Sequence, residues 1–327
     1  MKVTIVDNLK FARWDTFVDK SNNGTIFHKL KFLQYHQKRK FSFFNLVFHE
    51  DNNLIAVLPG SLQDGIFKSP VGASYGSFVT KKLSFQKYEE LVRCFIEFVK
   101  KNKIKEIYMT PPPIIYMRTY DETERFLLSY YGFQPEYHLI TSAVNLDFED
   151  KDDDVKYIVS KRLRSNIERS RKNNLMVKFS DDYESFYPIL IENKKKFNAK
   201  PTHSLDEIIT LKQLFPENIK LLMAYDGSMN PIAGIVLFIA NSTTVLTFYI
   251  SHNIKYQNLK PVSRLLYEIA LWSRKKGYKW LDFGVSMDTY SKNPMEPSRS
   301  LIFFKEGLNT SLFLRTTYHL ILTIQTK

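Results

Sequence analysis

The sequence predicts an α/β protein made of two tandem units, each a mixed central sheet flanked by helices. Three observations support this fold class: a globular composition, an acidic segment near the middle of the chain, and an order of strands and helices that occurs twice. The 327 residues suffice for two domains, and 44% are hydrophobic against 25% charged, which is typical of a folded chain. The 26 Phe and 19 Tyr residues supply ample material for a core.

An acidic segment separates the two predicted units. Residues 145–156, NLDFEDKDDDVK, show no apolar periodicity after Phe148, which is typical of a linker. We therefore expect an N-terminal domain at residues 1–148 and a C-terminal domain at residues 149–327.

In the first unit, two strands are followed by a helix and two further strands. Residues 49–79 alternate polar turns with two apolar strands. Residues 84–102 have apolar side chains at helical spacing after Ser84, a suitable N-cap. The strand IKEIYMT follows, and Gly132 precedes a final strand.

The second unit repeats this order. Residues 224–253 again contain a polar turn and two strands, and a helix is predicted over residues 261–277, with Pro at its first turn and Gly at its end. The strand YKWLDFG follows, and Gly307 precedes the last strand.

Equivalent landmarks in the two units are separated by nearly constant numbers of residues. The separations are 177, 174 and 175 residues, in the same order along the chain. The landmark pairs are Ile55-Ala56 with Ile232-Ala233, Lys105 with Lys279, and Gly132 with Gly307. We interpret the pattern as a duplicated α/β unit, although α/β proteins in general share such an order.

The charge of the chain favours polyanionic partners. The formal net charge is +13, which suits nucleic acid, an anionic membrane surface or phosphate-bearing substrates, but also fits a solvated basic surface. The one cysteine, Cys94, excludes a disulfide framework or a cysteine metal cluster, and we expect no metal. No stretch approaches the roughly 18 apolar residues of a membrane span and no signal peptide is evident, so we expect a cytoplasmic protein with at most peripheral membrane contact.

Three segments resemble a known family. They are GTIFHKLKFLQYH near the start, KRLRSNIERSRKNNLMV opening the second half, and KGYKWLDFGVS with FFKEGL near the end. Together with the order of elements, they resemble the acetyltransferase fold of the GNAT superfamily. Two such units in one chain resemble the FemABX and FemAB-like acyltransferases. The resemblance implies an activated acyl donor that is joined to an amine.

Members of this family differ in their donor. FemABX ligases take aminoacyl-tRNA and extend peptidoglycan precursor peptides, whereas other members resemble acyl-CoA enzymes that modify sugars or amino compounds. Here Thr110 stands before Pro111 where ligases often have aspartate, and Lys200 and Ser204 stand where they commonly have arginine and tyrosine. A long helical arm is also missing. We therefore expect an acyl-CoA-dependent N-acyltransferase acting on a small, nucleotide-linked or envelope-precursor amine, such as an amino sugar, amino acid or peptide.

The resemblance places the donor at the start of the helix in the second unit. There the pyrophosphate of coenzyme A meets backbone N–H groups at the helix N-terminus, next to a strand that splays from its neighbour. The matching turn is KYQNLKPVSRLL, in which Lys and Val replace the usual glycines. The candidate donor-binding residues are Gln257, Asn258, Lys260, Val262 and Arg264. The alternative is a plain surface turn, and we expect no donor in the first unit, whose domain would form a wall of the acceptor cleft.

Amide formation needs a base for the amine and donors for the developing oxyanion. Lys305, in FFKEGL, is either an oxyanion stabiliser, a phosphate ligand or a surface lysine with its stem on apolar neighbours. Asp282 is either a base, an orienting charge or a strand-end cap. Tyr249 is either catalytic or a packed aromatic, and His252 either a base or structural. The candidate substrate-binding residues are His28, Tyr75, Lys200, His203 and Ser286. The polar residues 286–301 are expected to form a loop between strands beside the acceptor.

Two further classes compete with this enzyme. An aminoacyl-tRNA-dependent peptide ligase would use the positive charge, including the basic residues 161–174, for tRNA phosphates. A non-catalytic nucleic-acid-binding protein would use it likewise, but no helix-turn-helix, zinc-finger or RNA-binding signature is present. The triplet DFG at residues 282–284 is that of protein kinases, yet the other kinase motifs are missing.

Overall fold

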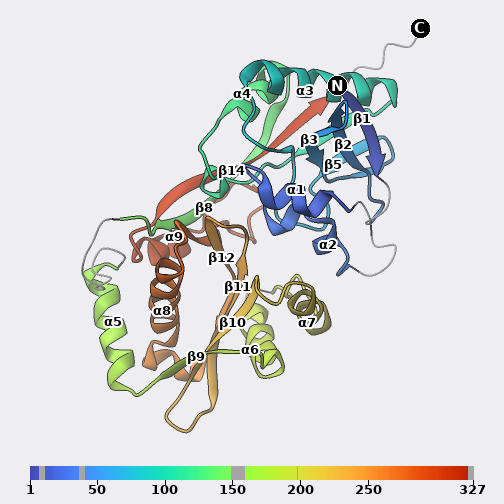
Figure 1. Cartoon of the computed structure of the whole chain (residues 1–327). Helices are drawn as coiled ribbons and strands as arrows, with labels where there is room; N and C mark the ends of the chain where they lie inside the picture. The colour runs from blue at the N-terminus through green and yellow to red at the C-terminus, as the bar shows by residue number, and fades with distance from the viewer. Residues whose placement is uncertain (7–11, 37–40, 149–158, 197, 323–327) are drawn as a thin grey trace. The chain divides into compact units, whose positions relative to one another are not determined.

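The computed structural model describes residues 1–6, 12–36, 41–148, 159–196 and 198–322 (Figure 1). The chain divides into two compact units. Unit 1 comprises residues 1–139, 292–295 and 314–327, and unit 2 comprises residues 140–291 and 296–313. Among the described residues, no helix has the length and apolar content that crossing a membrane requires.

Unit 1 contains two groups of strands. The first has the order β1-β2-β3-β6, with β1 (Lys2–Val6), β2 (Asn45–Glu50), β3 (Asn53–Leu58) and β6 (Val79–Thr80). The second has the order β4-β5-β7-β14, with β4 (Ser61–Gln63), β5 (Ile66–Ser69), β7 (Glu106–Met109) and the end of β14 (Ser311–Ile321). The helices are α1 (Trp14–Lys20), η1 (Ile26–His28), α2 (Leu30–Leu33), α3 (Phe85–Lys101), η2 (Ile114–Tyr116) and α4 (Thr123–Tyr130).

The helix α3 forms as its periodicity predicts. The Ser84 hydroxyl accepts a hydrogen bond from the backbone N–H of Lys87, which caps the helix. Leu91, Phe95 and Val99 follow at helical spacing and are fully buried. The Phe95 ring packs edge-to-face on other phenylalanines of the core, so the aromatic content of the chain is used inside unit 1.

Unit 2 is built on a sheet of order β8-β13-β12-β11-β10-β9. Its strands are the end of β8 (Gln134–Asn145), β9 (Met176–Ser180), β10 (Ile219–Tyr225), β11 (Pro231–Ile239), β12 (Thr244–His252) and β13 (Trp280–Val285). Its helices are α5 (Lys161–Lys172), α6 (Tyr183–Lys195), α7 (Leu205–Leu214), η4 (Ile254–Leu259), α8 (Pro261–Lys275) and α9 (Arg299–Glu306). The helices α5 and α8 pack together, and α8 buries Leu265, Leu266 and Ile269 in the core of the unit.

The predicted duplication appears as one motif in each unit. In unit 1, β5 leads through α3 into β7, which pairs with β5 in parallel. In unit 2, β12 leads through α8 into β13, which also pairs with β12 in parallel. The landmark pairs take equivalent places, since Lys105 and Lys279 precede β7 and β13. The predicted fold class, two mixed-sheet units flanked by helices, is confirmed.

The compact units nevertheless differ from the expected division at residue 148. The last strand, β14, pairs with β7 of unit 1, with Tyr318 opposite Met109. The end of β8, from the first half of the chain, pairs with β13 of unit 2, with Ala143 opposite Asp282. Each half of the sequence therefore contributes the end of one strand to the other unit, so a single boundary at residue 148 cannot separate the two units. The expected linker lies largely outside the described residues.

The segment before FFKEGL also differs from the expected loop. Met287 and Pro297 form an isolated antiparallel bridge, and the helix α9 begins at Arg299. Lys305 therefore lies on a helix, and its side chain is directed by the helical backbone.

Candidate active site

The strands β12 and β13 diverge in the middle of the sheet of unit 2. They pair in parallel only from Thr244–Leu246 with Trp280–Asp282. Beyond this point β12 continues to His252 along β11, while β13 shifts register against β8 between Asp282 and Val285. Gly284 has a φ of +71°, which favours glycine, and allows this change of direction. The divergence leaves the facing edge of β12 without its partner strand.

Lys305 is on the helix α9, and its side chain contacts the end of the diverging strand β13. Its ammonium donates hydrogen bonds to the carbonyl of Gly284 at 2.7 Å, the carbonyl of Val285 at 3.2 Å and the hydroxyl of Ser286 at 2.8 Å. Lys305 is only 4% exposed. Burial lowers its pKa to about 8, while the charge of Asp282 opposes that shift. The ammonium form therefore predominates at pH 7 and holds the turn after β13 in place.

Asp282 is fully buried on β13. Its Oδ1 accepts hydrogen bonds from the hydroxyl of Thr141 and, at 2.8 Å, from the backbone N–H of Gly284. The carboxylate thus caps the turn, which is one of the three roles that the sequence suggested, and at the same time places negative charge near Lys305. Thr141 was missed by sequence reasoning because it lies on β8, 141 residues away.

Tyr249 and His203 form a second polar pair in unit 2. The Tyr249 hydroxyl lies 2.9 Å from Nδ1 of His203 and accepts the backbone N–H of His203 at 3.0 Å. Both residues are 3% exposed, and burial raises the pKa of Tyr249 to about 12. The hydroxyl of Tyr187 donates to the carbonyl of His203 at 3.1 Å. Tyr249 stays protonated at neutral pH and anchors the segment before α7.

His252 ends the strand β12. Its Nε2 is buried and has no hydrogen-bond partner among the residues that the structure describes, and burial together with the charge of Lys196 lowers its pKa. The ring is therefore neutral at pH 7, the form that a general base requires. Lys200 is exposed on the segment between α6 and α7.

The predicted donor segment begins the helix α8. Gln257 and Asn258 are exposed on η4, and Arg264 pairs with Glu268 at 2.7 Å. Lys260 adopts a φ of +57° and stands at the N-cap, where no described side chain forms a capping hydrogen bond. The left-handed conformation is the one that glycine supplies most readily, so Lys260 performs the backbone role of a glycine that the sequence lacks. Val262 follows Pro261 in the first turn, whose N–H groups have no intrahelical acceptor.

The two predicted wall residues of unit 1 are buried. His28 is 0% exposed, with Nε2 3.0 Å from the Gly76 carbonyl and Nδ1 accepting the Thr25 N–H at 3.0 Å. Burial lowers the pKa of His28 to about 4. Tyr75 is 3% exposed and packs on Tyr116 and on the guanidinium of Arg315. A substrate role stays a prediction for both, and would require unit 1 to rearrange.

The comparisons with known structures identify the fold. Crystalline FemX superposes with a TM-score of 0.71 over 98% of this chain and 98% of its own, at 15% identity. The chain has the fold of FemX. L-PGS from Bacillus licheniformis superposes with a TM-score of 0.63 at 9% identity, over 99% of this chain and 95% of its own. A tandem GNAT protein from the clavulanic acid biosynthesis pathway gives 0.51 at 9% identity, over 98% of both chains.

This FemX-like fold confirms the sequence resemblance at the level of architecture. No protein-family model matches the sequence, and a search of curated proteins finds no match. At these low identities the similarity establishes the fold alone. Within the described part of the chain, no group of three or more His, Cys, Asp or Glu side chains could hold a metal ion.

Proposed function

We propose that the chain is an N-acyltransferase that moves an acyl group from acyl-CoA to the amine of a small, nucleotide-linked or envelope-precursor substrate. The observation that supports this most is the divergence of β12 and β13 directly before the uncapped N-terminus of α8. The unpaired edge of β12 offers backbone hydrogen-bond groups to an extended donor chain. The first turn of α8 offers N–H groups and the positive end of the helix dipole to its phosphates.

Positive side chains would complete the donor site. Lys255 is exposed and Lys260 half-buried at the start of α8, so their charges can approach a pyrophosphate without glycines. Gln257 and Asn258 lie on the same exposed turn and can donate hydrogen bonds. Arg264 would have to leave Glu268 to contribute.

Acyl transfer would take place at the end of β13. The amine nitrogen attacks the thioester carbonyl carbon, the C–N bond forms, and the C–S bond breaks to release the thiolate of coenzyme A. Neutral His252 would accept the proton of the amine, and that proton can later pass to the thiolate. The charge of Lys305 would favour the oxyanion that forms on the carbonyl oxygen. Asp282 and Ser286 would hold Lys305 and its turn in position.

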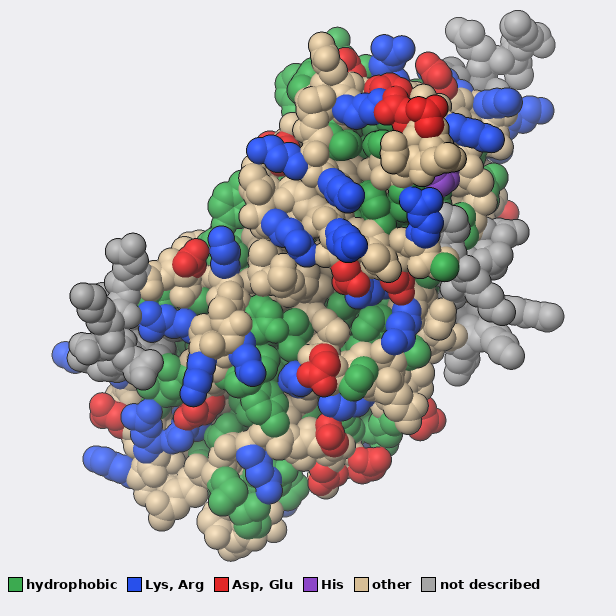
Figure 2. All heavy atoms as spheres, viewed as in Figure 1, with side chains coloured by type: hydrophobic (Ala, Val, Ile, Leu, Met, Phe, Trp, Pro, Cys, Tyr) green, Lys and Arg blue, Asp and Glu red, His purple; other side chains and the backbone are tan. Residues whose placement is uncertain are grey.

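A second candidate is an aminoacyl-tRNA-dependent ligase. The higher TM-score with FemX than with the tandem GNAT protein favours it, as does the net charge of +13. On the face drawn in Figure 2, Lys and Arg side chains gather around the position of α5. The exposed basic residues of α5 are Lys161, Arg162, Arg164, Arg169, Arg171 and Lys172. Such a helix suits phosphate contacts of a nucleic acid.

Donor binding distinguishes the two candidates. An acyl-CoA at 100-fold excess over its Kd should stabilise the protein by about 2.7 kcal/mol, which is visible as a rise in Tm. A screen of acyl-CoA donors against amine acceptors should then detect free thiol. If no acyl-CoA raises Tm, and tRNA binds with an affinity that falls steeply with salt, the ligase is the correct function.

A further inference from the structure

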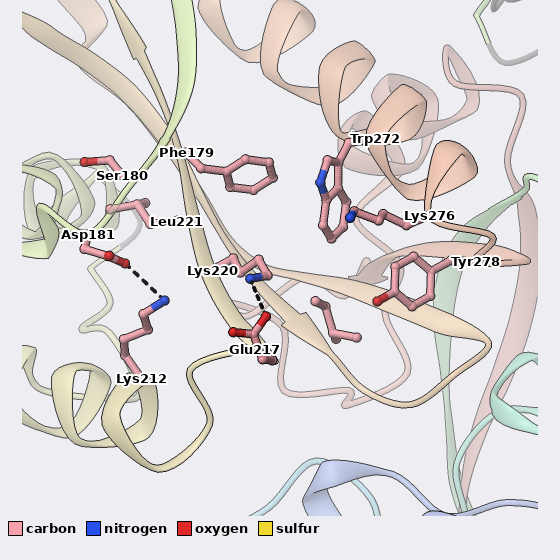
Figure 3. Close-up of a pocket in the computed structure, with 11 residues that line it drawn as sticks. Phe179, Ser180, Asp181, Lys212, Glu217, Lys220, Leu221, Trp272, Lys276 and Tyr278 are labelled. Atoms are coloured by element: carbon pink, nitrogen blue, oxygen red, sulfur yellow. Dashed lines mark hydrogen bonds and ion pairs between the residues drawn. The ribbon is translucent and has the colours of Figure 1, made fainter.

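A pocket of about 560 Å³ lies in unit 2, at the end of α8 opposite to the proposed donor site (Figure 3). Its walls come from β9, α7, β10, the end of β11 and the C-terminal end of α8 with the residues after it. The 15 residues of α8 span about 22 Å at 1.5 Å per residue, which separates this pocket from the turn that begins at Lys255. Its volume falls within the usual range of small-molecule sites.

Aromatic rings form one wall of the pocket. Phe179 on the edge strand β9 is 40% exposed, and its ring lies 5.2 Å from that of Trp272. Trp272 in turn stacks on Tyr278 at 5.8 Å, with the ring planes 30° apart. The Phe179 ring is tilted 60° from the Trp272 ring, so the three adjacent rings form an angled apolar wall with accessible surface. Base stacking on such a ring tolerates any nucleobase. Figure 3 shows the Tyr278 hydroxyl turned into the pocket.

Lysines form the opposite and outer walls. Lys212 pairs with Asp181 at 3.1 Å and Lys220 with Glu217 at 3.4 Å. The lysine side chains are 23% and 24% exposed, but the carboxylates are 77% and 88% exposed. The carboxylates, which also line the pocket, are therefore much more exposed to solvent than the lysines, and Lys212 donates a further hydrogen bond to the carbonyl of Pro216 at 3.2 Å. Such exposed pairs are weak, so an entering anion can replace the carboxylates.

Lys276 supplies an uncommitted charge. Within the part of the chain that the structure describes, its ammonium has neither an ion pair nor a hydrogen bond to the protein. Figure 3 shows it beside Trp272 and Tyr278, at the aromatic wall. The pocket thus combines a stacking surface with three ammonium groups, of which one is free.

We propose that this pocket binds a nucleoside phosphate, with the base on the aromatic wall of Phe179, Trp272 and Tyr278 and the phosphates on the lysines. Lys276 provides the first phosphate contact, and Lys220 and Lys212 exchange their rim carboxylates for the ligand. Neither an apolar ligand nor inorganic phosphate would use both walls. This site is separate from the proposed acyl transfer, and its occupant is a second ligand of the protein.

The test is calorimetric titration of the full chain with ADP, GDP, CDP and UDP, and with pyrophosphate and uridine as the two half-ligands. At least one diphosphate should bind, more tightly than pyrophosphate and uridine by tenfold or more, and less tightly as salt is added. Phe179→Ser should weaken it about tenfold, the size of one lost stacking contact. Lys276→Gln should weaken it severalfold, whereas Lys275→Gln, the exposed neighbour outside the pocket, should not.

Three outcomes would overturn the proposal. They are no binding of any nucleotide at millimolar concentration, pyrophosphate binding as tightly as the nucleotide, and nucleotide binding by the Phe179→Ser and Lys276→Gln variants that is as tight as binding by the parent protein. The last outcome would place the nucleotide elsewhere in the protein. Because Phe179 and Lys276 are both exposed, unchanged circular dichroism is expected for both variants. The result is independent of whether acyl-CoA binds at α8, so the two proposals can fail separately.

Discussion

Glu124 makes the stability of unit 1 depend on pH. The residue lies on α4 and is only 2% exposed. Its Oε1 accepts hydrogen bonds from the Ser77 hydroxyl and, at 3.3 Å, from the backbone N–H of Phe78. Burial raises the pKa of Glu124 to about 7 from an ordinary value of 4.5, against the opposing effect of the hydrogen bond from Ser77. The native state therefore favours the neutral carboxylic acid.

The sign and size of the effect follow from this shift. Because the folded pKa is raised, the native state binds the proton more tightly than the unfolded chain does. The resulting stabilisation is present in full below pH 4.5 and is lost as pH rises through 7. The difference of about 2.5 pKa units corresponds to about 3 kcal/mol in the free energy of unfolding at 1.36 kcal/mol per unit. Glu124→Gln keeps the shape of the neutral acid, so it should stabilise unit 1 by up to about 3 kcal/mol at pH 8 relative to the parent.

The assay is urea unfolding at pH 5, 6, 7 and 8 in a background with Trp272→Phe and Trp280→Phe. Fluorescence then reports Trp14, which is fully buried in unit 1. The free energies of Glu124→Gln and its parent should separate as pH rises, while Glu122→Gln, at a side chain that is 57% exposed, should follow the parent. If the difference between Glu124→Gln and the parent is the same at pH 5 and pH 8, the proposed burial of a neutral acid is wrong.

Four further predictions concern other sites. Above pH 8 the transferase rate should fall as the Lys305 ammonium loses its proton. Lys305→Ala should lose most activity and lower Tm, because the turn after β13 loses its buried hydrogen bonds, while circular dichroism still shows a folded chain; full activity would remove Lys305 from the mechanism. Thr141→Val should lower Tm, because the loss of one hydrogen bond to a charged group reduces the free energy of unfolding by about 2 kcal/mol. An unchanged Tm would mean that Asp282 does not need this hydrogen bond. Lys260→Gly should raise stability by up to about 1 kcal/mol in urea unfolding, because glycine accepts the positive φ, and a loss would contradict that backbone strain. In the Glu124→Gln variant, the free energy of unfolding of unit 1 in urea should decrease as pH falls from 6.5 towards 4. The reason is that the native state keeps the His28 ring neutral, whereas the unfolded chain protonates it. A free energy that does not change over this pH range would contradict the lowered pKa of His28.

Local patterns predicted local structure well. The helix α3 begins after Ser84, and α8 begins at Pro261, as their capping residues and apolar spacing indicated. The constant separation of landmarks predicted the duplicated strand–helix–strand motif that both units contain. These features depend on residues a few positions apart, so a single sequence contains them.

The candidate site was predicted only in part. Lys305, Asp282 and Ser286 were selected along one short stretch of chain, and they do lie together at the end of β13. The contact of Asp282 with Thr141 and that of His203 with Tyr249 were not predicted, because they join distant segments. The aromatic and basic pocket was not predicted either, since its lining residues come from five separate elements.

The sequence by itself determined the two main helices and the strands around them, that their order is duplicated, and which stretch near Lys305 contains chemically useful residues. Only the tertiary structure decided that β14 completes unit 1, that the end of β8 completes unit 2, and that β12 and β13 diverge before α8. The physical reason is the range of the interactions. Periodicity and capping act over one or two turns of chain, whereas strand pairing and burial depend on where the whole chain returns in space.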